Sequence, residues 1–191
     1  MSGQEGAAER ADRFLEHLNA IAGGRTPRII GIESTKPGLP NVGVAVYDHV
    51  PEPGMTTGIT YGLSMVDHEL WTTTRPELCL TVATRDDVWM HVLGELAERL
   101  RGECPFVLGS TIDIGGTITD ETEMTAFVVC PPAVLDRGDY EHVEVGDGRG
   151  INIVGVYPIH PSERRFIDDH GLEEFWQLSW DLFDVTRASI V

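Results

Sequence analysis

The chain has 191 residues, of which 41% are hydrophobic and 24% charged, values that are ordinary for one globular domain. Its three cysteines lie far apart, which excludes a CxxC metal site and a fully paired disulfide framework. No segment reaches the roughly 18 apolar residues that a membrane helix needs, and the polar amino terminus does not resemble a secretion signal. We therefore expect one soluble, cytoplasmic domain, residues 1–191, with no cofactor and no contact with a membrane.

The formal net charge of −17 is the most unusual bulk property, and it is unevenly distributed. Residues 1–112 carry 15 acidic and 9 basic side chains, whereas residues 113–191 carry 16 acidic and 5 basic side chains, giving −6 and −11. An acidic surface repels nucleic acids and anionic membranes and attracts basic proteins. Nucleic acid is therefore excluded as a partner, and acidity that serves only solubility is the preferred explanation of the charge, which alone names no partner.

Hydrophobic spacing in the first half predicts one helix followed by strands. Residues 9–22 place Phe14, Leu15 and Leu18 on one helical face, and Gly23 follows as a natural helix end. Runs rich in β-branched residues then predict four strands, at residues 28–32, 41–47, 56–63 and 78–83.

The clearest helix of the sequence follows these strands. Apolar residues recur at helical spacing from Val88 to Leu100, Thr84 is predicted to cap the helix, and Gly102 ends it. Further strands are predicted at residues 111–114, 117–119, 124–130 and 151–157, the last two ended by Pro131 and Pro158.

Two final segments, residues 162–170 and 172–180, have helical spacing and are separated by Gly171. Their inward-facing candidates are Phe166, Ile167, Phe175, Trp176 and Leu178. Strands outnumber helices and often follow one another directly, so the expected fold class is α+β, with a mixed, largely antiparallel β-sheet flanked by helices.

The segment Asp113-Ile114-Gly115-Gly116-Thr117 is the best candidate for a phosphate-binding hairpin, as found in sugar kinases of the actin-like ATPase type. Those enzymes carry the motif on their first hairpin and have two large lobes, whereas only 74 residues follow it here. A plain Gly-Gly turn between strands is the preferred interpretation. A phosphate-handling enzyme that uses Asp113 and Thr117 remains the alternative, together with a hydrolase that uses a spatial Ser/His/Asp set.

Other polar clusters have simpler explanations than catalysis. His160 and Glu163 are too few to hold a metal ion and are interpreted as a surface pair. Paired carboxylates such as Asp86-Asp87 and Asp168-Asp169 stand at helix starts or turns, where the helix dipole and solvent favour acidic residues. No cysteine or serine has a recognisable nucleophile motif, so we predict that the chain is not an enzyme.

From Tyr61 onward the chain resembles the suppressor of fused family, most strongly over residues 61–178. The segments that carry the resemblance are Tyr61-Gly62-Leu63-Ser64, Glu77-Leu78-Cys79-Leu80-Thr81-Val82, Leu96-Ala97-Glu98-Arg99-Leu100, Cys104-Pro105-Phe106 with Gly109, Ile153-Val154-Gly155-Val156-Tyr157-Pro158-Ile159, Ser162-Glu163-Arg164-Arg165 and His170-Gly171-Leu172. Each segment is short, and their consistent order over two-thirds of the chain is what indicates the family.

The resemblance implies a function in protein binding. The animal member of the family sequesters Gli transcription factors by holding a peptide strand between its two domains, and bacterial single-domain relatives are regarded as immunity proteins of polymorphic toxin systems. The length of this chain is similar to that of the bacterial form. We therefore expect a protein that neutralises or sequesters another protein, with a basic toxin domain as the leading partner. The second hypothesis is a binding module that serves as a scaffold or regulator within its own operon.

The same resemblance suggests where a partner would bind. In the animal protein, the segment after the long helix supplies an acidic contact to the peptide, and Ser110 stands at that position here. The contact itself does not carry over, but an exposed strand edge in this region can accept an added strand. The predicted partner-binding residues are Gly109, Ser110, Thr111, Asp113, Asp120, Glu121 and Glu123.

Overall fold

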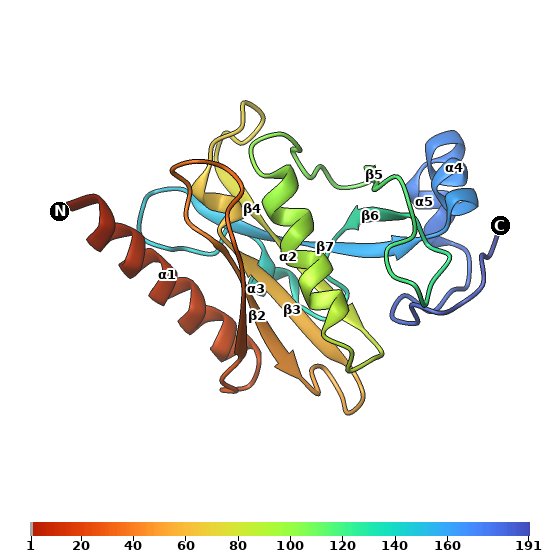
Figure 1. Ribbon diagram of the computed structural model, residues 1–191, viewed down its shortest axis with the longest axis horizontal. Coiled ribbons are helices and arrows are strands. Elements are labelled where there is room, and N and C mark those ends of the chain that lie inside the picture. Colours follow the sequence, from red (N-terminus) through yellow and green to blue (C-terminus); the bar gives the residue numbers. More distant parts are fainter. Residues whose placement is uncertain (1) are drawn as a thin grey trace.

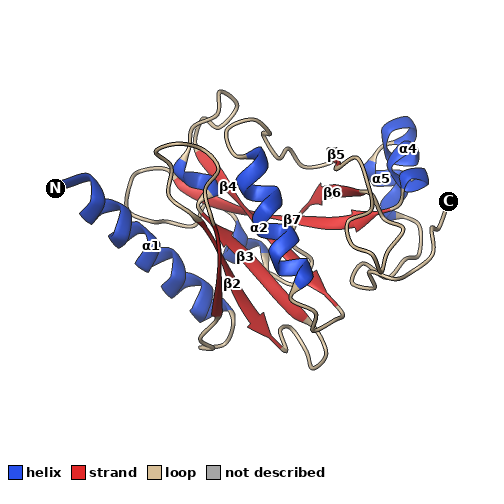
Figure 2. Ribbon diagram, viewed as in Figure 1, coloured by secondary structure: helices blue, strands red, loops and turns tan. Residues whose placement is uncertain are grey.

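The computed structural model describes residues 2–191 and shows a seven-stranded sheet with helices against it (Figures 1 and 2). In chain order the elements are α1 (Ser2–Ile21), β1 (Arg28–Ile32), β2 (Val42–Asp48), β3 (Thr56–Tyr61), the 3-10 turn Leu63–Met65, β4 (Thr74–Val82), α2 (Val88–Leu100), β5 (Thr111–Asp113), β6 (Ala126–Cys130), α3 (Arg137–Tyr140), β7 (Gly150–Ile159), α4 (Pro161–His170) and α5 (Leu172–Trp176). The predicted α+β class is confirmed.

The strand order β1-β2-β3-β4-β7-β6-β5 joins two antiparallel units through a parallel pair in the middle. β1 to β4 form one antiparallel meander, and β7, β6 and β5 form the other. Between them β4 pairs with β7 in parallel, from Thr74 opposite Gly150 to Cys79 opposite Gly155. This arrangement leaves β1 and β5 at the two edges of the sheet.

Both faces of the sheet are buried, because helices cover each of them (Figure 1). Val42, Val44 and Val46 of β2 belong to the core cluster under α2, whereas Ala45 and Tyr47 belong to the second cluster, which contains Phe14 and Leu18 of α1. The alternation follows from the two-residue period of a strand, which sends successive side chains to opposite faces. The sheet is therefore the middle of three layers.

The helix α2 approaches its face of the sheet unusually closely. A Cβ atom at Gly94 would lie 2.5 Å from Cγ1 of Ile32, and one at Gly58 on β3 would lie 2.5 Å from Sδ of Met90. Real Cβ atoms do not tolerate such separations, so the two glycines set the distance between helix and sheet. Trp89, also on α2, is 1% exposed and fills the core.

Glu77 of β4 is a carboxylate with no exposed surface, placed at the parallel junction. One carboxylate oxygen accepts hydrogen bonds from the backbone N–H groups of Gly62 and Ser64, each at 2.9 Å, and from Oγ of Ser64 at 2.7 Å. The other accepts one from Oγ1 of Thr60 at 2.6 Å. These bonds fix the turn after β3 onto β4, because a buried charge is tolerated only when its hydrogen-bonding capacity is satisfied.

A second polar cluster fastens α1 to the sheet. Asp147, in the loop before β7, accepts a hydrogen bond from Arg10 of α1 at 2.7 Å and pairs with Arg75 of β4. Partial burial raises the pKa of Asp147, but the hydrogen bonds from Arg75 and Arg10 outweigh it and lower the pKa to about 2.

The segment after α5 packs back against α4, where it bonds to Glu163, a residue of α4 that is fully buried. Glu163 accepts hydrogen bonds from the backbone N–H of His160 at 2.9 Å, from Nη2 of Arg187 at 2.8 Å and from the N–H of Ile190 at 3.1 Å. The prediction of a surface pair at His160 and Glu163 was therefore wrong, because a buried arginine partner 24 residues away makes burial of the acid possible.

Other boundaries differ from the sequence prediction for identifiable reasons. Residues 117–119 form a loop rather than a strand, α5 ends at Trp176, and the short helix α3 was not predicted. β7 continues through Pro158, since β4 pairs with β7 only as far as Gly155 and a strand tolerates proline where one side is free.

Two side-chain predictions were also wrong. Thr84 does not cap α2, because the helix begins after Asp87 without a side-chain cap. Trp176, expected in the core, is 43% exposed. Within residues 2–191, no helix has the length and apolar composition required to cross a membrane.

We predict that Glu77→Gln will lower the free energy of unfolding by about 2 kcal/mol, since it replaces charge-assisted hydrogen bonds with neutral ones and turns an amide toward Thr60. Glu77→Ala should cost more, because it leaves buried donors unpaired. Urea unfolding measures the change, and Glu69→Gln, at an exposed position, is the matched control. Equal stability of the two glutamine variants would contradict this role.

The Asp147 cluster predicts a specific acid sensitivity. A carboxyl whose pKa is lowered on folding contributes stability that is fully present above the unfolded pKa, here 3.8, and is lost as the pH falls toward about 2. Asp147→Asn should therefore flatten the loss of thermal stability in this interval, while Asp12→Asn, on the exposed side of α1, should not. An unchanged pH profile in Asp147→Asn would refute the assignment.

Candidate partner-binding edge

The strand β5 forms one edge of the sheet, beside α4 and α5 (Figure 1). It pairs with β6 alone, with Thr111 opposite Val128 and Asp113 opposite Ala126. Gly109, which precedes the strand with φ of 88°, donates its N–H to the carbonyl of Val129 at 2.7 Å. The positive φ at Gly109 lets the chain turn into the strand, since this conformation is strained for residues with a side chain.

The backbone of β5 presents free hydrogen-bonding groups at this edge. Val129 donates to the carbonyl of Ser110 at 2.9 Å, and Ile114 donates to the carbonyl of Thr125 at 3.1 Å. In an antiparallel ladder the residues that bond to one neighbour alternate with residues that point away from it. The N–H and C=O groups of Thr111 and Asp113 therefore point away from β6, toward the edge of the sheet.

The side chains of the same two residues contact α4. Thr111 donates its hydroxyl to Oδ1 of Asp168 at 3.2 Å, and Asp113 forms an ion pair with Arg164. Arg164 also lies 3.8 Å from the carboxylate of Asp168, four residues along the helix. These contacts hold β5 by one face and leave its backbone edge uncovered. Nothing in the sequence indicated that Arg164 and Asp168 would meet β5, because 51 residues or more separate them.

The other face of β5 borders a groove beneath α2. Ile112 and Ile118 line it together with Val92, Leu96 and Phe127, and the enclosed volume is about 210 Å³. Glu95 and Arg99 of α2 lie at its margin. A strand added next to β5 would direct alternate side chains toward this groove and toward α4.

The three remaining predicted residues, Asp120, Glu121 and Glu123, lie in the loop between β5 and β6 and are exposed. Their neighbours Ile118 and Met124 are buried, and the backbone N–H of Ile118 donates to the carbonyl of Met124 at 3.0 Å. The loop therefore has an apolar inner side and an acidic outer side. The structure thus places all seven predicted residues in one hairpin.

Within the described residues 2–191, the surroundings of Asp113 do not form a phosphate-binding or hydrolytic site of the kinds considered from the sequence. Its carboxylate accepts the N–H of Gly115 at 2.8 Å and pairs with Arg164, so the segment 113–117 forms a turn held by internal bonds. Burial raises the pKa of Cys79 and Cys130 to about 12, which keeps both thiols protonated and unreactive. Over residues 2–191, no three His, Cys, Asp or Glu side chains are grouped as a metal site would require.

The fold and this edge define an α+β domain with a mixed seven-stranded sheet and an open strand at one margin. The sequence model of the suppressor of fused protein family matches residues 38–188. The chain therefore belongs to the suppressor of fused family. None of the curated proteins matches it.

Solved structures support the same fold. A suppressor of fused homologue from Neisseria gonorrhoeae is 22% identical, with a TM-score of 0.71, and the match covers 94% of this chain and 96% of that one. Drosophila Suppressor of Fused is 12% identical, with a TM-score of 0.65 over 92% of this chain, which spans 50% of the Drosophila chain. A chain in the crystal structure of the Sufu–Fu complex is also 12% identical, with a TM-score of 0.66, covering 92% of this chain and 90% of that one.

The outward orientation of the β5 backbone predicts a pattern of amide exchange. The amides of Thr111 and Asp113 should exchange with solvent faster than the amide of Ile112, which faces β6. Residue-resolved hydrogen exchange by NMR measures this difference. Equal protection of all three amides would show that the edge is covered, and the candidate site would be wrong.

Proposed function

We propose that this protein is a non-catalytic binding domain whose β5 edge receives an extended segment of a partner protein. The observation that carries the proposal is the pair of residues Thr111 and Asp113, whose backbone groups point away from β6 at the edge of the sheet. Adding a strand to such an edge supplies main-chain hydrogen bonds, while the neighbouring grooves select side chains. A family relative crystallised in complex with Fu supports protein binding as the common theme.

We further propose that the partner is basic and that binding neutralises it, as an immunity protein neutralises a toxin in the cytoplasm. Exposed carboxylates at Asp120, Glu121 and Glu123 lie in the hairpin that contains the edge, and residues 113–191 carry 16 acidic against 5 basic side chains. Such a field accelerates the association of a cationic partner, and salt weakens the effect within a Debye length of about 10 Å.

Affinity purification followed by mass spectrometry identifies the partner, and co-expression then tests the consequence. If the partner is a toxin encoded nearby, this protein should restore growth to cells that express it. A partner that is harmless to the cell would overturn the immunity proposal and make the chain a regulator, while leaving the binding site in place. If no captured protein loses its binding when β5 is altered, the proposed binding site is wrong as well.

Two sets of variants separate the backbone and charge contributions. Thr111→Pro removes an outward N–H without removing a backbone bond to β6, and it should weaken the partner complex by about tenfold or more, whereas Thr111→Val, which loses only the hydroxyl contact with Asp168, should not. The triple change of Asp120, Glu121 and Glu123 to Lys should mainly slow association at low salt. The matched control changes exposed Glu16, Glu52 and Glu69 to Lys. Stopped-flow association rates distinguish these outcomes, and equal effects of the two triple variants would contradict a local role for the loop.

A further inference from the structure

The helix α1 lies at the side of the sheet and is held there by few of its side chains (Figure 1). Of the α1 side chains that the structure describes, only Phe14 and Leu18 are buried, each 1% exposed. The helix α2 is shorter, with 13 residues, yet it buries seven of them. Because packing of an apolar face supplies most of the free energy that holds a helix in place, α1 is the more weakly held of the two.

α1 occupies a groove between the sheet and the segment 134–147, which passes along the helix. Arg10 donates to the carboxylate of Asp147 at 2.7 Å, and Nε2 of His17 donates to the carbonyl of Asp139 at 2.7 Å. We call this groove, without the helix, the α1 groove. Its floor is the apolar surface of β2, β3 and β7, formed by Ala45, Tyr47, Ile59, Ile151 and Ile153.

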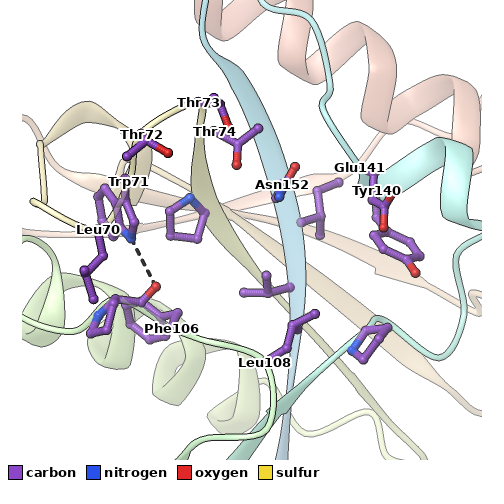
Figure 3. Close-up of a pocket in the computed structure, with 15 residues that line it drawn as sticks. Leu70, Trp71, Thr72, Thr73, Thr74, Phe106, Leu108, Tyr140, Glu141 and Asn152 are labelled. Atoms are coloured by element: carbon purple, nitrogen blue, oxygen red, sulfur yellow. Dashed lines mark hydrogen bonds between the residues drawn. The ribbon is translucent and has the colours of Figure 1, made fainter.

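The wall of the α1 groove is bonded to β7 without the help of α1. Val143 exchanges two backbone hydrogen bonds with Ile151, at 2.7 and 2.9 Å. Oδ1 of Asn152 accepts the N–H of His142 at 2.8 Å, and Figure 3 shows Tyr140 of the same wall to one side of Asn152. None of these bonds involves α1, so the shape of the wall does not depend on the helix.

α1 fills its groove incompletely at the carboxy-terminal end. Phe14, Leu18 and Ala22 are spaced by four residues and therefore lie on one face, and the last of them has a small side chain. Gly23 then ends the helix, so no larger apolar side chain continues the row. A cavity of about 330 Å³ remains there, lined by Leu18, Ile21, Ala22, Tyr47, Val50, Ile59 and Leu135 among others.

The connection between α1 and β1 allows the helix to move without disturbing the sheet. Gly23 and Gly24 have φ of 70° and 77°, and a Cβ atom at either position would face open space. Arg25 then donates to the carbonyls of Asp48 at 3.0 Å and His49 at 2.8 Å. Arg25 therefore anchors the chain to the end of β2, and the two conformationally free glycines lie on the α1 side of this anchor.

These contacts define the helix that the groove accepts. We propose that the α1 groove is a docking site for an amphipathic helix of a partner protein, and that α1 is its internal competitor. The partner helix carries a cation, an aromatic residue and an aliphatic residue at four-residue spacing, as Arg10, Phe14 and Leu18 do. A large apolar residue follows in place of Ala22. Such a helix replaces α1 because it pairs with Asp147 and also fills the cavity that α1 leaves.

This surface is separate from the proposed edge site. The floor of the α1 groove belongs to β2, β3 and β7, whereas the edge is β5, and β6 lies between β7 and β5 in the strand order. Neither site requires the other, so the two proposals can fail independently.

The test uses the full chain and two fluorescent peptides with the sequence of residues 2–24, one unchanged and one with Ala22→Phe. The Ala22→Phe peptide should bind about tenfold more tightly than the unchanged peptide, because its phenyl ring is buried in the cavity. Fluorescence anisotropy measures both affinities. Binding should also accelerate the solvent exchange of the α1 amides in the isotope-labelled chain, measured by NMR, since the chain's own helix is displaced.

Substitutions in the chain separate competition from binding. Phe14→Ala weakens the docking of the chain's own α1, so it should tighten peptide binding by about tenfold or more, since the open state becomes more populated. Phe166→Ala, the same change on α4, is the matched control and should leave peptide binding unchanged. Adding Asp147→Asn to the Phe14→Ala chain should weaken binding, because the arginine of the peptide loses its carboxylate partner.

Three results would overturn the proposal. The first is a Phe14→Ala chain that binds neither peptide, or that binds both equally. The second is peptide binding that leaves the exchange of the α1 amides unchanged, since the peptide would then lie elsewhere. The third is a free chain that sediments as a dimer and becomes a monomer when the Ala22→Phe peptide is added, because α1 would then be exchanged between two copies of the chain.

Discussion

The parallel pairing of β4 with β7 is the constraint on which the rest of the structure depends. It joins two antiparallel units that share one core cluster, and its paired residues, such as Thr74 and Gly150, lie 76 positions apart in the sequence. Glu77 strengthens β4 at this junction, because it accepts one hydrogen bond from β3 and three from the turn after β3 without any contact with solvent. With the centre of the sheet fixed, β5 becomes an edge, and the prolines after β6 leave β7 partly unpaired.

Arginine placement explains why the surface of the second half is so acidic. Of its five basic residues, Arg149 bonds to Asp67 and to the carbonyl of Trp71, Arg164 holds β5, and Arg187 pairs with Glu163. These cations tie loops, strands and the carboxy-terminal segment together, so they neutralise acids that already have structural roles. The remaining carboxylates stay at the surface, and the acidic character of residues 113–191 is concentrated there.

Local patterns in the sequence were sufficient to predict most of the helices and strands. The bounds of β1 and α2 match the prediction, because a two-residue or 3.6-residue apolar period and flanking glycines determine them locally. The prediction was wrong at Trp176, because periodicity alone does not show whether a covering segment exists. It was also wrong at His160 and Glu163, because Arg187 reaches them through a tertiary contact without a local pattern.

The candidate site likewise depends partly on local sequence and partly on tertiary structure. The edge residues were named from the family resemblance, and the position of β5 in the strand order is what makes them an edge. The ladder between β6 and β7 ends at Cys130 opposite Gly155, directly before Pro131 and Pro132. The prolines are visible in the sequence, but the register between these two distant strands is not encoded in any short segment.

An open strand edge is also a hazard, since two identical edges can pair and lead to aggregation. At β5 that pairing would bring Asp113 and the acidic loop of one molecule against those of another, in a chain whose net charge is −17. Like charges in close contact are unfavourable, while a cationic strand would meet no such barrier. The carboxylates around this edge therefore oppose its pairing with a second copy of the chain, and they would not oppose the proposed cationic partner.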